Sequence, residues 1–119
     1  VQSWDFTFRA TNSGSYVVGQ VWGRIGADRY LLDQTRDRRD FPGSVAAIRS
    51  LSDRWPASRE KLVEDKANGP AIVATLRHEI PGLIEVSPEG GKLARANAVA
   101  WQVEAGNVYL PEPRLAPWI

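Results

Sequence analysis

Residues 61–70 have the sequence KLVEDKANGP, and this stretch decides which class of fold the chain adopts. Its first four residues have the length and the apolar centre of a short buried strand. Residues 68–70 (Asn-Gly-Pro) are typical of a helix start, because proline lacks an N–H that would have no partner in the first turn. The stretch therefore predicts a strand, a short connection and a helix, with two acids, Glu64 and Asp65, where the strand ends.

The chain before this stretch predicts three strands joined by turns. Residues 3–9 alternate Trp4, Phe6 and Phe8 with polar side chains, which is the period of a strand with one apolar face. Residues 16–22 and 29–34 predict a second and a third strand, and the residues between the strands are rich in turn formers. Because the connections are short, the three strands are expected to form an antiparallel meander.

Helical periodicity replaces strand periodicity after residue 40. One helix is expected up to Pro56 and a second from Pro70 to Pro81, because apolar side chains recur every three or four residues in both. Residues 83–86 predict a fifth strand, residues 92–104 a third helix, and residues 108–110 a short extended segment. The apolar positions of the first two helices are Val45, Ile48, Leu51 and Trp55, and Ile72, Val73, Leu76 and Ile80.

The resulting order of elements, β-β-β-α-β-α-β-α, indicates the fold class. Hairpin strands followed by helix-connected strands give an α/β fold, in which a mixed sheet has helices packed on its faces. This is the order of the ribonuclease H-like fold, with strand order 3-2-1-4-5. In that strand order the first and the fourth strand are neighbours.

Composition excludes several classes of function. With 119 residues, 43% of them hydrophobic, the chain is long enough for one globular domain. A net charge of +1 excludes a uniformly basic nucleic-acid binder but allows a local basic patch. The absence of cysteine excludes disulfides, thiolate metal sites and cysteine nucleophiles. Methionine is also absent, so the sequence is interpreted as a piece of something longer.

Three acids are candidates for a metal site. Asp5 lies in the middle of a strand, where aspartate is disfavoured, and it is either solvated on an open face or a metal ligand. Glu64 and Asp65 end the fourth strand, where they either mark the exit of the chain into solvent or supply a ligand. Successive strand residues point to opposite faces, so only one of the two is expected to face Asp5. Mg²⁺ and Mn²⁺ prefer such oxygen ligands, and two ions can hydrolyse a phosphodiester.

Basic residues give weaker signals. Lys92 and Arg95 share one face of the third helix and could bind DNA phosphate, although a solvated face is the more frequent explanation. Lys66, which follows Glu64 and Asp65 in the sequence, is a third candidate for DNA binding. In residues 36–40, the arginines Arg36, Arg38 and Arg39 are interrupted by Asp37 and Asp40, and the segment is interpreted as an ordinary charged loop. No P-loop pattern occurs in the chain, so no ATP site is expected.

Along almost its whole length, the chain resembles the C-terminal domain of phage and prophage large terminase subunits. The most specific match is Glu64-Asp65-Lys66-Ala67-Asn68-Gly69, and the other matches follow in the order of the family. They are Ser3-Trp4-Asp5, Val21-Trp22-Gly23, Arg39-Asp40-Phe41-Pro42, Ile80-Pro81-Gly82, Gly91-Lys92-Leu93-Ala94-Arg95-Ala96, the segment 104–111 and Ala116-Pro117-Trp118.

The resemblance implies a ribonuclease H-like endonuclease that cuts concatemeric double-stranded phage DNA with two Mg²⁺ or Mn²⁺ ions. In the family the first-strand aspartate is a metal ligand, which falls on Asp5, and the second ligand falls on Glu64, with Asp65 as the fallback. The full family protein also carries an N-terminal ATPase domain, which residues 1–119 lack. It works in the cytoplasm of the bacterial host, with the small terminase subunit and the portal protein as partners.

Two departures from the family pattern affect the expected site. Ser15 stands where many members carry an aspartate in the turn before the second strand. The remaining acids of the family lie beyond the tryptophan matched by Trp118, so residues 1–119 are expected to lack the third carboxylate. The alternatives are another ribonuclease H-like enzyme, of the resolvase or transposase type, and a docking domain for DNA or the portal that keeps the fold without the chemistry.

Overall fold

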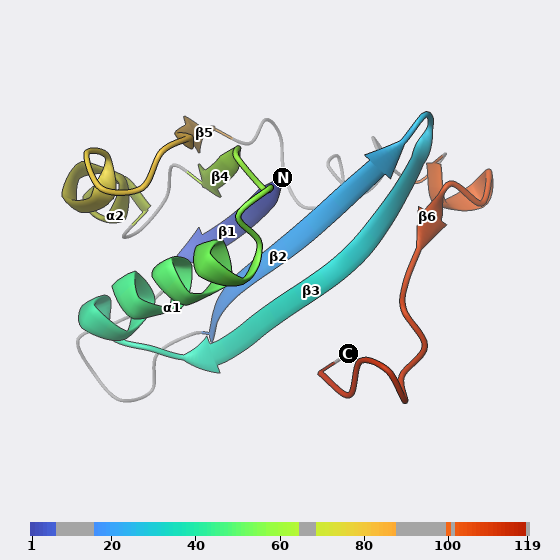
Figure 1. Ribbon diagram of the computed structural model, residues 1–119, viewed down its shortest axis with the longest axis horizontal. Helices are drawn as coiled ribbons and strands as arrows, with labels where there is room; N and C mark the ends of the chain where they lie inside the picture. The colour runs from blue at the N-terminus through green and yellow to red at the C-terminus, as the bar shows by residue number, and fades with distance from the viewer. Residues whose placement is uncertain (7–15, 65–68, 88–99, 101, 119) are drawn as a thin grey trace.

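Six strands of the described residues form one mixed sheet in the computed structural model (Figure 1). The structure describes residues 1–6, 16–64, 69–87, 100 and 102–118. The strands lie side by side in the order β5-β4-β1-β2-β3-β6. The elements are β1 (Gln2–Phe6), β2 (Tyr16–Ile25), β3 (Asp28–Arg38), α1 (Phe41–Arg54), β4 (Lys61–Glu64), α2 (Gly69–Leu76), β5 (Leu83–Val86) and β6 (Val108–Tyr109).

The topology confirms the predicted strand order 3-2-1-4-5 and adds β6 at the edge beside β3. Strands β1, β2 and β3 are antiparallel neighbours, whereas β4 runs parallel to β1 and β5 parallel to β4. β6 runs parallel to β3, and the stacked rings of Tyr30 and Tyr109 join the two strands, with centroids 4.8 Å apart. In Figure 1 the long β2–β3 hairpin extends past the shorter strands β1 and β4.

Predicted boundaries are wrong at both ends of the β2–β3 hairpin and at the end of α2, which stops at Leu76 and not at Pro81. Residues 23–28 were expected to form a turn, but β2 continues to Ile25 and only Gly26 and Ala27 form it, with Gly26 at φ +59°. The expected charged loop at Arg36 and Arg38 is strand as well. These residues extend because β2 supplies backbone partners as far as its first residue, Tyr16. Most of the predicted helix 92–104 lies outside the described residues, although residues 102–104 are helical.

Both α1 and α2 pack on one face of the sheet and form the core with it. Phe6 and Val63 of the sheet meet Ile48 and Leu51 of α1, and all four are at most 1% exposed. Ile72 and Leu76 of α2 complete the same cluster. Neither α1 nor α2 is long enough to span a membrane, and no other described helix is long and apolar enough to do so. We call this face of the sheet the helix face.

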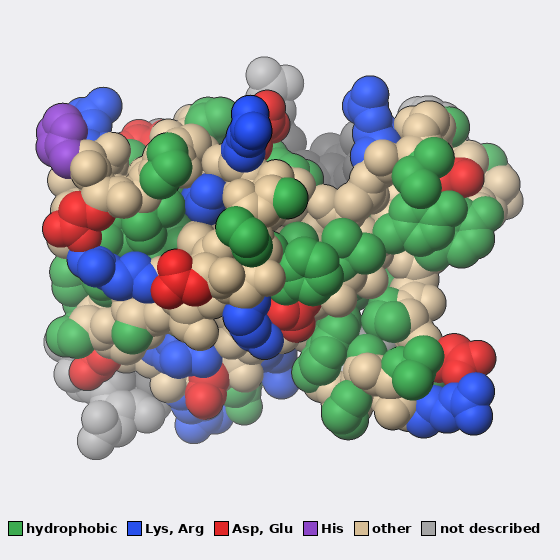
Figure 2. All heavy atoms as spheres, viewed as in Figure 1, with side chains coloured by type: hydrophobic (Ala, Val, Ile, Leu, Met, Phe, Trp, Pro, Cys, Tyr) green, Lys and Arg blue, Asp and Glu red, His purple; other side chains and the backbone are tan. Residues whose placement is uncertain are grey.

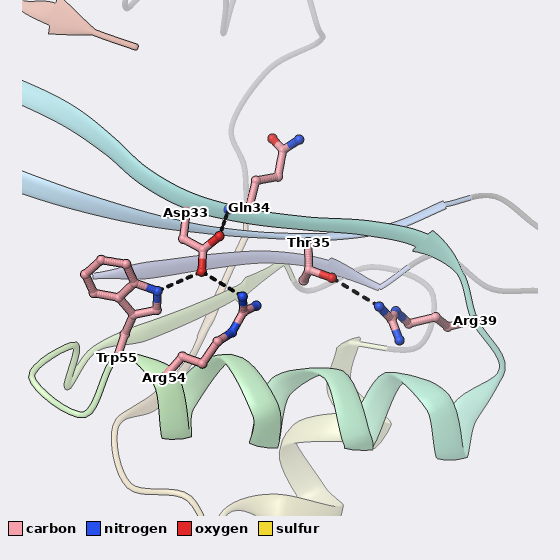
Figure 3. A network of polar contacts seen from close by, with 6 residues as sticks. All are labelled: Asp33, Gln34, Thr35, Arg39, Arg54 and Trp55. Carbon is pink, nitrogen blue, oxygen red and sulfur yellow. Dashed lines mark hydrogen bonds and ion pairs between the residues drawn. The ribbon is translucent and has the colours of Figure 1, made fainter. Parts of the chain in front are cut away.

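Polar contacts fix both ends of α1 to the structure around it. Asp40 caps the N-terminus, where its carboxylate accepts a hydrogen bond of 2.8 Å from the Gly43 N–H. At the other end, the buried Asp33 carboxylate of β3 accepts a bond of 2.8 Å from Trp55 Nε1 and pairs with Arg54 at 3.2 Å (Figure 3). This network holds the C-terminal end of α1 against β3, so that α1 stays packed on the helix face.

A buried lysine positions the start of β4. The Lys61 side chain is 4% exposed, and its Nζ donates to the carbonyl oxygens of Ser58, Arg59 and Pro81 at 2.9–3.2 Å. Burial lowers the pKa of Lys61, while the three bonds use all three N–H groups of the protonated amine. Lys61, the first residue of β4, therefore connects the segment before β4 with the segment after α2.

Candidate functional site

The sheet face opposite α1 and α2, which we call the site face, carries the polar residues of β1 and β4. Gln2, Trp4 and Phe6 of β1 are buried on the helix face, so Ser3 and Asp5 between them point to the site face. In β4 the same alternation buries Val63 and leaves Leu62 and Glu64 on the site face. Alternation along two short strands thus places one acid from each strand on one surface.

Strand register brings the two acids together. β1 and β4 run parallel, with Ser3 opposite Leu62 and Trp4 opposite Val63. Asp5 and Glu64 are the next residues along these two strands, and both line one pocket of about 430 Å³. The pocket is otherwise lined by Ser3, Trp4, Val18, Gln20, Leu62 and Val86. The structure therefore places Asp5 and Glu64 on adjacent parallel strands at a common cavity, the geometry expected from the sequence.

The donor chemistry of this pocket suits a hard divalent cation. Carboxylate oxygens from two rigid strands, an amide from Gln20 and a hydroxyl from Ser3 are oxygen ligands of the kind that Mg²⁺ and Mn²⁺ take. Within the described part of the chain, no group of three or more acids and histidines could hold a metal. Asp5 and Glu64 are two anionic groups at this pocket, and their role as metal ligands remains a prediction.

Four other predicted site residues fall outside the residues that the structure describes: Asp65, Lys66, Lys92 and Arg95. Their roles as fallback ligand and as DNA-binding residues therefore remain predictions.

Sequence reasoning missed a chain of amide side chains beside the pocket. Trp22 Nε1 donates to Gln20 Oε1 at 2.9 Å, and Gln20 Nε2 donates to Gln34 Oε1 at 2.7 Å. Gln34 Nε2 then reaches the Trp118 carbonyl oxygen at 3.5 Å. These hydrogen bonds fix the orientation of Gln20 at the pocket, and residue 118 is two hydrogen bonds away from this pocket residue. Gln20 and Gln34 gave no signal in the sequence, because glutamine is common on exposed faces of strands.

Gly69 is a second residue whose part in the site was missed. It begins α2 so close to the end of β4 that a Cβ would overlap the Glu64 carbonyl oxygen and lie 3.1 Å from Val63 Cγ1. The Asn-Gly-Pro signal indicates a helix start, but it does not show that the helix packs directly on the strand. Gly69 therefore sets the backbone position of Glu64 at the pocket.

Replacing Gly69 with alanine is expected to shift the end of β4 and to disturb Glu64. Because backbone must move to admit the new methyl group, we expect a stability loss of about 1–3 kcal/mol, measured by thermal denaturation. The control is Gly26→Asn, at a turn with φ +59° and nothing within 4 Å of a new Cβ, where asparagine is tolerated. An alanine variant as stable as this control would show that Gly69 does not constrain β4.

The strand order and the two acids on the site face together define a ribonuclease H-like domain. A family model described as the terminase RNaseH-like domain matches residues 2–119, and the chain belongs to that family. Among solved structures, the chain is similar to the large terminase from a thermophilic bacteriophage, with a TM-score of 0.72. The two are 11% identical, and this similarity shows the fold. No curated protein sequence matches the chain significantly.

The shared region covers 93% of this chain and 28% of the thermophilic phage terminase chain. The domain thus corresponds to a little over a quarter of that terminase.

Proposed function

We propose that this domain is the metal-dependent DNA endonuclease of a phage large terminase. It would cut concatemeric double-stranded DNA in the bacterial host cytoplasm, together with a small terminase subunit and a portal protein. The observation that carries the proposal is the pair Asp5 and Glu64, which line one pocket on adjacent strands of a terminase RNaseH-like domain. A resolvase or a transposase of the same fold would share the carboxylates but not the family.

In the proposed mechanism, Asp5 and Glu64 would hold the divalent cations. Bound Mg²⁺ or Mn²⁺ would supply an activated water and would offset charge on the leaving oxygen of the phosphodiester. The two strands hold the carboxylates at fixed positions, since their backbones are paired on both sides within the sheet. Gln20, oriented by Trp22 and Gln34, remains available to hydrogen-bond a bound water or the substrate.

Charge balance implies that further anionic groups complete the site. Two divalent ions bring four positive charges, and Asp5 and Glu64 supply two negative ones. DNA phosphate provides part of the difference, and Asp65 is the fallback ligand. The family resemblance places additional acids after the tryptophan matched by Trp118, whose carbonyl oxygen contacts Gln34 beside the pocket. We propose that such acids join the site, and that residues 1–119 alone bind metal weakly and cleave poorly.

A plasmid-nicking assay tests the proposed function. Supercoiled DNA is incubated in Mn²⁺, Mg²⁺ or EDTA, either with residues 1–119 or with the large terminase polypeptide that carries this domain. We expect nicked and linear DNA with the longer polypeptide in either metal, little product with residues 1–119, and none in EDTA. Equal activity of both proteins would overturn the requirement for further acids. DNA binding without metal-dependent cleavage by the longer polypeptide would favour a docking domain instead.

A further inference from the structure

One row of residues crosses the site face from the acid pair to an arginine. Asp5 is opposite Val18 in the β1–β2 register, and Val18 is opposite Arg36 in the β2–β3 register. Val18 lines the pocket with Asp5, and opposed residues of antiparallel strands point to the same face, so Arg36 belongs to the site face. At about 4.8 Å between neighbouring strands, the backbones of Arg36 and Asp5 are about 10 Å apart.

Arg36 and Arg38 gather around one aromatic ring. The Cζ of Arg36 lies 3.8 Å from the centre of the Tyr16 ring, and that of Arg38 lies 5.2 Å from it. Tyr16 is opposite Arg38 in register, so all three side chains lie on the site face. Arg36 belongs to the pocket row, and Tyr16 and Arg38 lie two residues further along their strands. We call Tyr16, Arg36 and Arg38 the arginine cluster. A guanidinium stacked on a ring has a restricted orientation before any ligand binds.

Ion pairing sets the arginine cluster apart from three other described arginines. No ion pair involving Arg36 or Arg38 is found in the part of the chain that the structure describes, whereas Arg49, Arg54 and Arg114 each pair with a carboxylate. Asp37 lies between the two arginines but is opposite the buried Val17, which directs it to the helix face. Its carboxylate accepts a bond of 2.8 Å from the Arg38 backbone N–H.

We propose that the arginine cluster binds a phosphate of the DNA strand that is cut at the Asp5–Glu64 pocket. Guanidinium groups recognise phosphate oxygens through paired hydrogen bonds, and phosphates recur about every 3.4 Å along the axis for each strand, so one within about three nucleotides of the cut reaches the cluster. The acid pair repels DNA unless cations are bound, and two positive charges on the same face offset that repulsion. The inference rests on the proposed endonuclease function and adds a substrate-positioning site to it.

The alternation Arg36-Asp37-Arg38 is the sequence signal for this site once the segment is known to be a strand. In a loop the charge of Asp37 would offset that of one arginine, but in a strand the period of two places Asp37 and the two arginines on opposite faces. Over α1 on the helix face, basic and acidic side chains lie next to one another (Figure 2).

The test measures DNA binding and cleavage by the terminase polypeptide with Arg36→Gln, Arg38→Gln and both changes. The matched controls are Arg49→Gln in α1 and Arg77→Gln after α2, which remove the same charge elsewhere. We expect the double variant to bind DNA at least about tenfold more weakly and to raise KM similarly, with kcat little changed. The slope of log K against log salt should fall by about one for each phosphate that the variant no longer neutralises, and the controls should stay near the wild type.

The possible outcomes separate this inference from the proposed function. If the double variant binds and cuts DNA like the wild type while Asp5→Asn does not cut, the arginine cluster is not a phosphate site and the endonuclease function stands. Equal weakening by the cluster variants and the controls would also overturn the inference, because it would show a general effect of charge. A wild type that neither binds nor cuts DNA would remove the proposed function and the inference with it. Arg36→Lys, which keeps the charge but not the planar group, should give an intermediate KM.

Discussion

Replacement of Asp5 by asparagine is expected to reduce metal-dependent nicking by more than about 100-fold. Asparagine keeps the shape of the side chain but removes the charge that offsets the charge of the cation. Changes to groups that only support metal ligands already cost about 10–100-fold, so removal of a direct ligand should cost more. The measurement is the initial rate of plasmid nicking in Mn²⁺ and in Mg²⁺. Because Asp5 is exposed on the site face, thermal stability should stay close to that of the wild type.

The control for this prediction is Asp53→Asn. Asp53 is an exposed residue of α1, on the other side of the sheet, and its replacement removes the same charge from the chain. Nicking by the control should match the wild type. Undiminished cleavage by the Asp5 variant would refute the metal-binding role of Asp5, and equal losses in both variants would point to net charge instead of ligation.

Gly19→Ala is expected to cause a large loss of stability. Gly19 is opposite Trp4 in β1, and a Cβ at this position would lie 2.5–2.7 Å from three ring carbons of Trp4. The ring cannot move away, because it is 2% exposed, stacks on Phe6 with a centroid distance of 5.1 Å and donates Nε1 to Gln2 at 2.9 Å. Overpacking of this kind costs about 1–3 kcal/mol. The melting temperature should therefore fall by roughly 5–12 °C.

Two further variants identify the cause of that loss. Gly23→Ala lies in the same strand, but its Cβ would meet the movable end of the exposed Leu32 side chain at 3.2 Å, so we expect a small effect. Adding Trp4→Phe to Gly19→Ala should cost less than the sum of the two single changes, because the smaller ring leaves room for the methyl group. If the two changes are additive, the collision with Trp4 is not what makes Gly19 necessary.

Much of the fold was predictable because proline and glycine residues lie near the ends of several strands and helices. The boundaries of β4 and β5 match the prediction, and proline and glycine stand near both strands. The segment 36–38 was mistaken for a loop because alternating charges resemble solvated loop sequence. Its strand conformation depends on pairing with residues 16–18, which are distant in the sequence. β6 has only two residues, which is too short to show a periodicity, so its pairing with β3 could not be predicted.

The candidate site was predictable where it depends on strand order and not where it depends on close packing. Once the first and the fourth strands are neighbours, alternation places Asp5 and Glu64 on one face. The contact of Gly69 with the end of β4 and the contacts of Gln20 with Trp22 and Gln34 depend on three-dimensional packing, which local patterns do not encode. The arginine cluster depends on the β2–β3 register, so the error in the boundary of β3 concealed it.

Paramagnetic broadening by Mn²⁺ tests most directly whether the Asp5–Glu64 pocket binds metal. It detects weak binding, which is the strength expected for residues 1–119. In ¹H–¹⁵N spectra at low Mn²⁺, the amide signals of Asp5, Val18 and Glu64 should broaden first, and the double variant Asp5→Asn, Glu64→Gln should lose this localised effect. Broadening centred elsewhere, or unchanged in the double variant, would contradict the assignment of this pocket as the metal site.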